Sequence, residues 1–300
     1  MKKNIGRGIF FAVAGAMGWG ISGVCSQYLF MNYGTDAGWL TAVRMIFAGI
    51  LLIILAAGTG GRQVLQVFSR PRDILQLAAF ALLGLLLCQF TYMSAIRYSN
   101  SATATVLQSL NVVIMALLTS LQQRIRLTLR QIAAVFLAVL GTYFIASGGR
   151  SDGLSFTGLG LVMGLLSAVG VVTYTLLARP IIKKYGSICV TGWGMLIGGL
   201  VSAFYTRAWN LPGNLDYKAI LVIVLIVTLG TAFGFSAFLE GTKYLGPARA
   251  TLLGCLEPVS AAVFSALFLK SPFGIFDALG FCCILGTVFL SVGRSARESA

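Results

Sequence analysis

The chain has 300 residues, of which 58% are hydrophobic and 10% charged. Soluble globular proteins are typically about 45–50% apolar and about 25% charged, so this composition excludes an ordinary soluble fold. The net charge of +14 would suggest a nucleic-acid partner in a soluble protein. Here the basic residues form short clusters between apolar runs, which indicates a multi-span membrane protein that does not bind nucleic acid.

A helix needs about 20 apolar residues to cross a bilayer. The sequence predicts an all-α protein with ten such helices, near residues 8–30, 38–58, 73–96, 101–122, 127–147, 156–178, 187–206, 217–240, 247–269 and 274–293. The first follows a basic segment, Met1–Arg7, and no small-residue cleavage site is evident. We therefore expect a retained first helix rather than a signal peptide.

Basic residues alternate between the two sides of this predicted arrangement. With the N-terminus in the cytoplasm, the inner segments hold Lys2, Lys3, Arg7, Arg62, Arg70, Arg72, Arg124, Arg126, Arg130, Arg179, Lys183, Lys184, Lys243, Arg249, Arg294 and Arg297. The outer segments hold only Arg97, Arg150, Arg207, Lys218 and Lys270, and Arg44 falls within a span. The positive-inside rule thus favours ten spans in the cytoplasmic membrane with both termini in the cytoplasm.

The sequence also contains an internal repeat. The segment YSNSATATVLQSLNVV (Tyr98–Val113) aligns with YLGPARATLLGCLEPV (Tyr244–Val259), and Asn32-Tyr33-Gly34 aligns with Lys184-Tyr185-Gly186. We therefore divide the chain into two repeats, 1–150 and 151–300, of five spans each. An odd number of spans inverts the second copy, and inverted halves are typical of transporters.

Three segments carry a family resemblance: WGISGVCSQYLF (Trp19–Phe30), WLTAVRMIFAGILL (Trp39–Leu52) and GPARATLLGCLEPVSAAVFSALFLKSP (Gly246–Pro272). They resemble EamA-type members of the drug/metabolite transporter superfamily, which include amino-acid and metabolite exporters of the YddG type. The resemblance covers nearly the whole chain. It implies ten helices as two inverted five-helix repeats around a central cavity, and export of small organic solutes such as amino acids.

The first half departs from the family pattern. A proline usually lies midway along the fourth helix of each family repeat. Pro258 occupies that place in the second half, where we expect a helix kink, whereas the first half has Val112. Because of this difference, we do not expect the two halves to move in a strictly symmetric way.

Polar residues inside spans are costly in hydrocarbon, so they are the candidates for a substrate site. Glu257 is expected near the midplane beside Pro258, as a substrate or proton site or as a structural acid. Asn111 is its repeat partner, and Gln108 lies one turn earlier. These amides can bind an amino acid or join helices. Arg44 can bind a carboxylate, reach the outer interface or pair with an acid.

Other polar and aromatic residues fall within the predicted spans and can line a cavity. They are Trp19, Gln89, Tyr92, Tyr174 and Trp193, although packing is a sufficient explanation for any one of them. Glu240 and Lys243 are expected to form a local pair at i, i+3.

We expect a secondary transporter that exports small metabolites such as amino acids by alternating access, with protons as the natural coupling ion. Aromatic residues near the midplane leave an exporter of cationic drugs or amines open. A membrane-embedded enzyme or a channel is a further alternative. The sequence has no histidine, and its six cysteines show no C-x-x-C spacing. We therefore expect no metal, no cofactor and no catalytic residues.

Overall fold

A computed structural model of the chain describes residues 2–99, 101–124, 127–147, 157–213, 215–269 and 274–292. These residues are almost entirely helical, and no strand occurs among them. A helix satisfies its backbone donors and acceptors within one segment, which is why long apolar runs fold this way in lipid. Several basic positions used above to orient the chain lie outside the described residues: Arg126, Arg150, Lys270, Arg294 and Arg297.

The first half forms five helical rods. They are α1 (Lys2–Tyr33); α2 (Ala37–Gly60); a rod of α3 (Pro71–Ala79), π-helical η2 (Phe80–Leu86) and α4 (Leu87–Tyr98); a rod of α5 (Ser101–Ser109) and α6 (Asn111–Gln123); and α7 (Leu129–Ser147). A 3₁₀ helix, η1 (Gly61–Phe68), lies between the second and third rods, where the sequence predicted only a loop.

The second half repeats this order. Its rods are α8 (Gly158–Tyr185); α9 (Ser187–Thr206); a rod of α10 (Tyr217–Leu225), π-helical η3 (Ile226–Phe233) and α11 (Gly234–Leu245); a rod of α12 (Pro247–Gly254) and α13 (Leu256–Leu269); and α14 (Ile275–Val292). In both halves the third rod contains a π-helical segment and the fourth is broken near its middle. Single π-helical segments are often found at functional sites.

Seven helices in the described residues are long and apolar enough to cross a membrane. They are Ile5–Tyr33, Ala37–Gly58, Pro71–Tyr98, Ala104–Gln122, Gly158–Tyr185, Ser187–Thr206 and Tyr217–Leu245. Two shorter apolar helices, Leu129–Phe144 and Ala278–Thr287, fall below the spanning length. The protein is therefore a multi-pass membrane protein.

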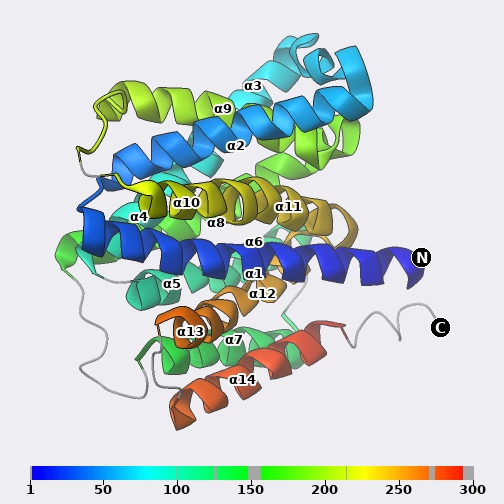
Figure 1. Ribbon diagram of the computed structural model, residues 1–300. Coiled ribbons are helices and arrows are strands. Elements are labelled where there is room, and N and C mark those ends of the chain that lie inside the picture. Colours follow the sequence, from blue (N-terminus) through cyan, green and yellow to red (C-terminus); the bar gives the residue numbers. More distant parts are fainter. Residues whose placement is uncertain are drawn as a thin grey trace.

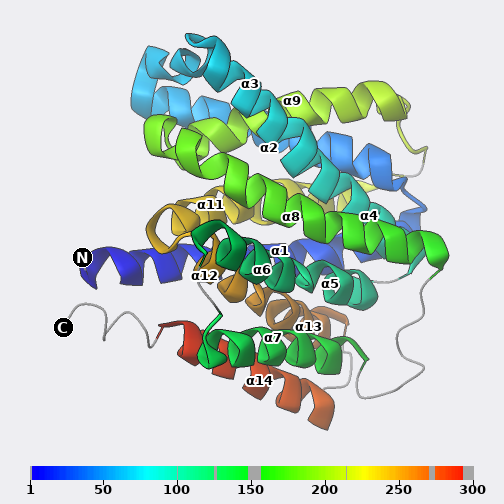
Figure 2. The same cartoon turned by 180° about the vertical axis from the view of Figure 1, so that it is seen from behind.

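The rods run roughly along one axis (Figure 1). The second rods, α2 and α9, pack on each other, and so do the fifth rods, α7 and α14. These pairs lie on opposite sides of the bundle, with α1 and α8 between them (Figures 1 and 2). Each first rod packs on the third rod of the other half: α1 on η3 and α11, and α8 on η2 and α4. The largest apolar core, which includes Phe80, Tyr174 and Phe238, lies among these rods.

Two turns join the first and second rods in equivalent ways. Gly34 follows α1 with φ of +60°, and Gly186 follows α8 with φ of +82°. Both are in the left-handed region, where a side chain is disfavoured and glycine is not. These are the glycines of the aligned Asn-Tyr-Gly and Lys-Tyr-Gly triplets, so the repeat in sequence places the same turn in each half.

The two ends of the bundle differ in charge. We call the end where α1 begins the basic end, because Arg7, Arg130, Lys184 and Lys243 lie near the helix ends there. We call the opposite end, where α1 ends at Tyr33 and α2 begins, the far end.

Candidate functional site

A buried cavity lies where the first, third and fourth rods of both halves meet, together with α2. Its volume is about 50 Å³, which is room for roughly one or two water molecules. All but one of the candidate residues line it: Trp19, Arg44, Gln89, Tyr92, Gln108, Asn111, Tyr174, Glu257 and Pro258. An amino acid would therefore fit only if the cavity widened.

Positions that align in the repeat line this cavity in pairs. The fourth rods contribute Thr105 with Thr251, Gln108 with Gly254, Ser109 with Cys255, and Asn111 with Glu257. The third rods contribute Gln89 with Phe235 and Tyr92 with Phe238 at the same offset. The first rods contribute Trp19 with Val171 and Ser22 with Tyr174. The two residues of each pair are as far apart in sequence as the aligned residues Tyr33 and Tyr185. Arg44 has no such counterpart, since no residue of α9 lines the cavity.

Arg44 carries a positive charge into this cavity and is only 3% exposed. Its Nε donates to Oγ1 of Thr231 across 3.0 Å, and its Nη1 contacts the sulfur of Met93 at 3.4 Å. The ion pairs found in the described part of the chain do not include one between Arg44 and Glu257. Arg44 does not extend to the membrane interface, so the cavity wall contains a guanidinium held by neutral groups.

Glu257 brings a carboxyl group to the same cavity and is 7% exposed. The hydroxyl of Tyr92 donates to Glu257 Oε1 across 3.0 Å and lies 2.9 Å from Oγ1 of Thr105. Thr105 in turn donates to the carbonyl oxygen of Ser101 at 2.8 Å. A hydrogen-bonded chain thus links the carboxyl group to the first residue of α5.

Both fourth rods break beside these polar residues. Leu110 separates α5 from α6, and Cys255 separates α12 from α13. Pro258 is the third residue of α13, within the first turn, where backbone N–H groups have no partner inside the helix. The break therefore precedes the proline that we expected to kink the helix. In the first half Asn111 Nδ2 donates to the carbonyl oxygen of Gln108 at 2.6 Å, and the rod breaks there without a proline.

Three buried polar atoms on the cavity-lining residues lack a hydrogen-bond partner in the described part of the chain. They are Nε1 of Trp19, Oγ of Ser22 and Oδ1 of Asn111. An unsatisfied buried polar group costs about 1–3 kcal/mol, so such groups are rare unless water or a ligand satisfies them. They are one donor, one hydroxyl and one acceptor that a polar ligand could bind.

Aromatic rings form another part of the wall. The ring of Trp19 lies 4.9 Å from that of Phe235 and 4.7 Å from that of Phe238, measured between centroids. Tyr174 packs on the same two phenylalanines. The cavity thus combines a guanidinium, a carboxyl group, several amides and hydroxyls, and an aromatic surface.

Trp193 does not line the cavity. Its Nε1 donates to the carbonyl oxygen of Val64 across 3.0 Å, and its ring packs edge-on against Phe68 near the basic end. Sequence reasoning missed other lining residues, among them Ser22, Thr105 and Phe235. Helical spacing could have found the first two, because Ser22 lies one turn after Trp19 and Thr105 one turn before Gln108.

Glu240 and Lys243 form the expected local pair, 3.2 Å apart near the basic end. No group of three or more His, Cys, Asp or Glu side chains with the geometry of a metal site occurs in the described ranges.

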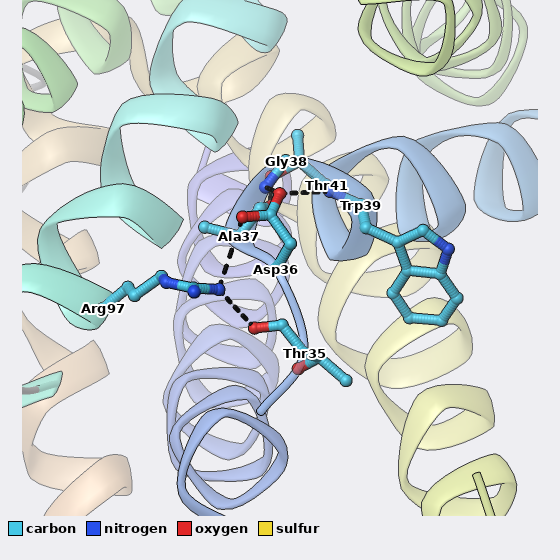
Figure 3. Close-up of polar contacts among 7 residues, drawn as sticks. All are labelled: Thr35, Asp36, Ala37, Gly38, Trp39, Thr41 and Arg97. Carbon is cyan, nitrogen blue, oxygen red and sulfur yellow. Dashed lines mark hydrogen bonds and ion pairs between the residues drawn. The ribbon is translucent and has the colours of Figure 1, made fainter. Parts of the chain in front are cut away.

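Polar contacts join the helix ends at the far end. Arg97 at the end of α4 donates from Nη1 to the carbonyl oxygen of Thr35 at 2.7 Å and pairs with Asp36 Oδ2 at 3.3 Å (Figure 3). Asp36 Oδ1 also accepts from the backbone N–H groups of Gly38 and Trp39, at the start of α2 (Figure 3).

A second contact at this end joins the two halves. The hydroxyl of Tyr33 donates to Asp216 Oδ1 across 2.7 Å. The backbone N–H of Ala219 and this hydroxyl hold the pKa of Asp216 below its usual value. Asp216 is therefore ionised at neutral pH.

Comparisons with known proteins agree with a transport role. The model of the EamA-like transporter family matches residues 6–147 and 158–293. The chain is 33% identical over 297 residues to the uncharacterized inner membrane transporter YicL of Salmonella typhimurium, covering 98% of this chain and 97% of YicL. It is 21% identical to the uncharacterized transporter YetK of Bacillus subtilis, covering 87% of this chain and 79% of YetK. A crystal structure of a protein with 18% identity matches 96% of this chain and 99% of its own with a TM-score of 0.72, a likeness of fold alone.

Proposed function

The chain belongs to the EamA-like transporter family, and we propose that it carries small zwitterionic metabolites, amino acids foremost, by alternating access. The observation that carries the proposal is the joint presence of Arg44 and Glu257 in one buried cavity. A charge buried in a membrane is costly unless it is paired or solvated. A zwitterion supplies a partner for each group: its carboxylate for the guanidinium fork and its ammonium for the carboxylate.

The remaining wall fits such a substrate. The unpartnered atoms of Trp19, Ser22 and Asn111 can bind further polar groups, and the aromatic rings can pack on an apolar side chain. The helix breaks also place the first turns of α6 and α13 at the cavity, where backbone N–H groups favour an anionic group. Broken helices around a central site are common in secondary transporters.

The proposed architecture is ten membrane-spanning rods in two inverted repeats, 1–150 and 151–300. The reciprocal packing of first rods on third rods supports it, as do the paired lining positions of the cavity. We place the basic end in the cytoplasm, because basic residues favour that side. Both termini then lie in the cytoplasm, and the protein lies in the cytoplasmic membrane.

Alternating access requires that the cavity open to one side at a time. The contacts of Arg97 and Tyr33 close the far end in this conformation. Opening the far end would release substrate to the outside, which is the direction of export. We propose protons as the coupling ion and Glu257 as their carrier, because it is an acid in the cavity with a hydroxyl partner in Tyr92.

A cationic amine is the second candidate substrate. Glu257 and the rings of Trp19, Phe235 and Phe238 would attract it. Arg44 in the same wall opposes a substrate that has no carboxylate. We therefore rank a zwitterion first.

Reconstituted liposomes test the proposal. Uptake of labelled amino acids is measured beside decarboxylated amines of the same side chains, with unlabelled competitor in each case. We expect saturable uptake of amino acids that falls in Glu257→Gln and in Arg44→Gln. Uptake of the amines alone would select the second candidate. Absence of saturable uptake of both classes, with and without a pH gradient, would contradict the proposed substrate.

A further inference from the structure

A second and larger hollow lies at the basic end, apart from the central cavity. It has a volume of about 560 Å³ and lies among α1, η1, η3, α11 and the turn from α8 to α9. This volume falls within the range of sites that bind small molecules and cofactors, about 300–1,000 Å³.

The α11 rod separates the hollow from the cavity. Phe235 and Phe238 line the cavity on one side of the rod. Ser236, Ala237 and Glu240 line the hollow on the other side. Residues three or four apart share one face of a helix, so these sets lie on opposite faces. An occupant of the hollow would therefore bind at a site of its own.

Among the described residues that line the hollow, one cation has no hydrogen-bond or ion-pair partner. Glu240 accepts from Ser187 at 2.7 Å and pairs with Lys243 at 3.2 Å. Lys184 pairs with Asp73 at 2.9 Å, although its side chain is still 49% exposed. Arg7 is exposed and forms no hydrogen bond or ion pair with the residues that the structure describes. The charge that remains available to a ligand is positive.

The wall of the hollow also contains large apolar side chains that are partly exposed. Phe233 is 44% exposed and Ile188 is 41% exposed, and both line the hollow. In a membrane protein such side chains contact acyl chains. The hollow thus offers a cation toward the water and an apolar surface toward the lipid.

We propose that this hollow binds the headgroup of an anionic phospholipid. The phosphate contacts Arg7 and the exposed part of Lys184, and the acyl chains lie against Phe233 and Ile188. Basic pockets between helices at the cytoplasmic surface bind anionic headgroups in this way. A free phosphate ion would use the cations alone and leave the apolar wall unused.

Native mass spectrometry of the purified full-length protein tests this site. The protein is equilibrated with equal amounts of phosphatidylglycerol and phosphatidylcholine, and the retained lipids are counted. We expect preferential retention of phosphatidylglycerol, reduced about five-fold in Arg7→Gln, the factor expected for one basic side chain near a lipid surface. Lys183→Gln is the matched control, because Lys183 adjoins Lys184 but does not line the hollow.

Two further measurements test whether the variant protein is folded and whether the apolar wall contributes to lipid binding. Melting temperatures in phosphatidylcholine show whether Arg7→Gln remains folded. Phe233→Ser, which leaves every charge in place, should also reduce phosphatidylglycerol retention. Equal retention in wild type, Arg7→Gln and Lys183→Gln would overturn the proposal. Displacement of the lipid by millimolar inorganic phosphate, with no effect of Phe233→Ser, would show a site for free anions instead.

Discussion

The Nε of Arg44 donates to Oγ1 of Thr231 across 3.0 Å, joining α2 of the first half to the π-helical segment η3 of the second. Thr231 donates in turn to the carbonyl oxygen of Ile226, five residues earlier. The wide turn of η3 and the position of the guanidinium are therefore linked. The guanidinium has five N–H donors, so this bond leaves others available to a substrate.

Two substitutions of Arg44 distinguish the effect of its charge on amino-acid affinity from the effect of its planar guanidinium. A charge-assisted hydrogen bond contributes about 1.5–3 kcal/mol, so Arg44→Gln should weaken amino-acid affinity by about ten- to a hundred-fold. Arg44→Lys should restore little, because lysine lacks the planar fork. Competition with unlabelled amino acid in liposomes measures this. Thr231→Val is the matched variant, and we expect a smaller loss because the guanidinium charge remains. Equal affinity in all four proteins would remove Arg44 from the site.

Glu257 should determine the pH dependence of transport. If its carboxyl carries the coupling proton, Glu257→Gln should abolish the effect of a pH gradient and flatten the pH profile of uptake. Asp216→Asn provides the control at the far end. The pKa of Asp216 is lowered, so its stabilising contribution is present above its unfolded pKa and is lost only as the pH falls through its folded value. Its replacement should leave the shape of the profile unchanged. An unaltered profile in Glu257→Gln would assign the proton to another group.

Much of this arrangement follows from the sequence, because its causes are local. Apolar runs and basic clusters locate the helices and the basic end, and Gly34 and Gly186 lie at the turns that their aligned triplets predict. Arg44 and Glu257 were candidates because charged side chains are costly in hydrocarbon, and both line one cavity. Whether that cavity binds substrate stays a prediction.

Other features depend on contacts between distant segments. The π-helical segments have no sequence period that distinguishes them from α-helix. The place of Trp193 depends on η1, where a loop was expected, because its indole binds Val64 there. The contacts at the far end depend on Arg97 meeting a turn about sixty residues away in sequence, which no local pattern reveals.

The broken fourth rods allow a test with proline. Val112 is the second residue of α6, and Pro258 is the third residue of α13. A proline in the first turn of a helix removes no internal hydrogen bond, so Val112→Pro should fold and transport. Ala116→Pro, inside α6, should cost about 3 kcal/mol or more and sharply lower the yield of folded protein. Thermal unfolding in detergent measures both. Equal destabilisation by the two substitutions would show that α5 and α6 behave as one continuous helix.

The far-end contacts should control local opening more than overall stability. Arg97 and Asp36 have side chains that are 41% and 62% exposed, and such pairs contribute about 0–1 kcal/mol. Arg97→Gln should therefore change the melting temperature little. It also weakens the bond to the Thr35 carbonyl, so backbone amides near the start of α2 should exchange hydrogen for deuterium about five-fold faster, the factor for about 1 kcal/mol of local opening.

Arg207→Gln is the control for this substitution, because Arg207 is also at the far end and its side chain has no partner among the described residues. If the contacts of Arg97 hold the far end shut, only Arg97→Gln should speed exchange there, and the effect should be confined to the ends of α1 and α4 and the starts of α2 and α10. Faster exchange throughout the bundle would indicate a general loss of stability instead. Unchanged exchange at the far end would mean that Tyr33 and Asp216 suffice to close it, and the double variant Arg97→Gln/Tyr33→Phe would then be required to open it.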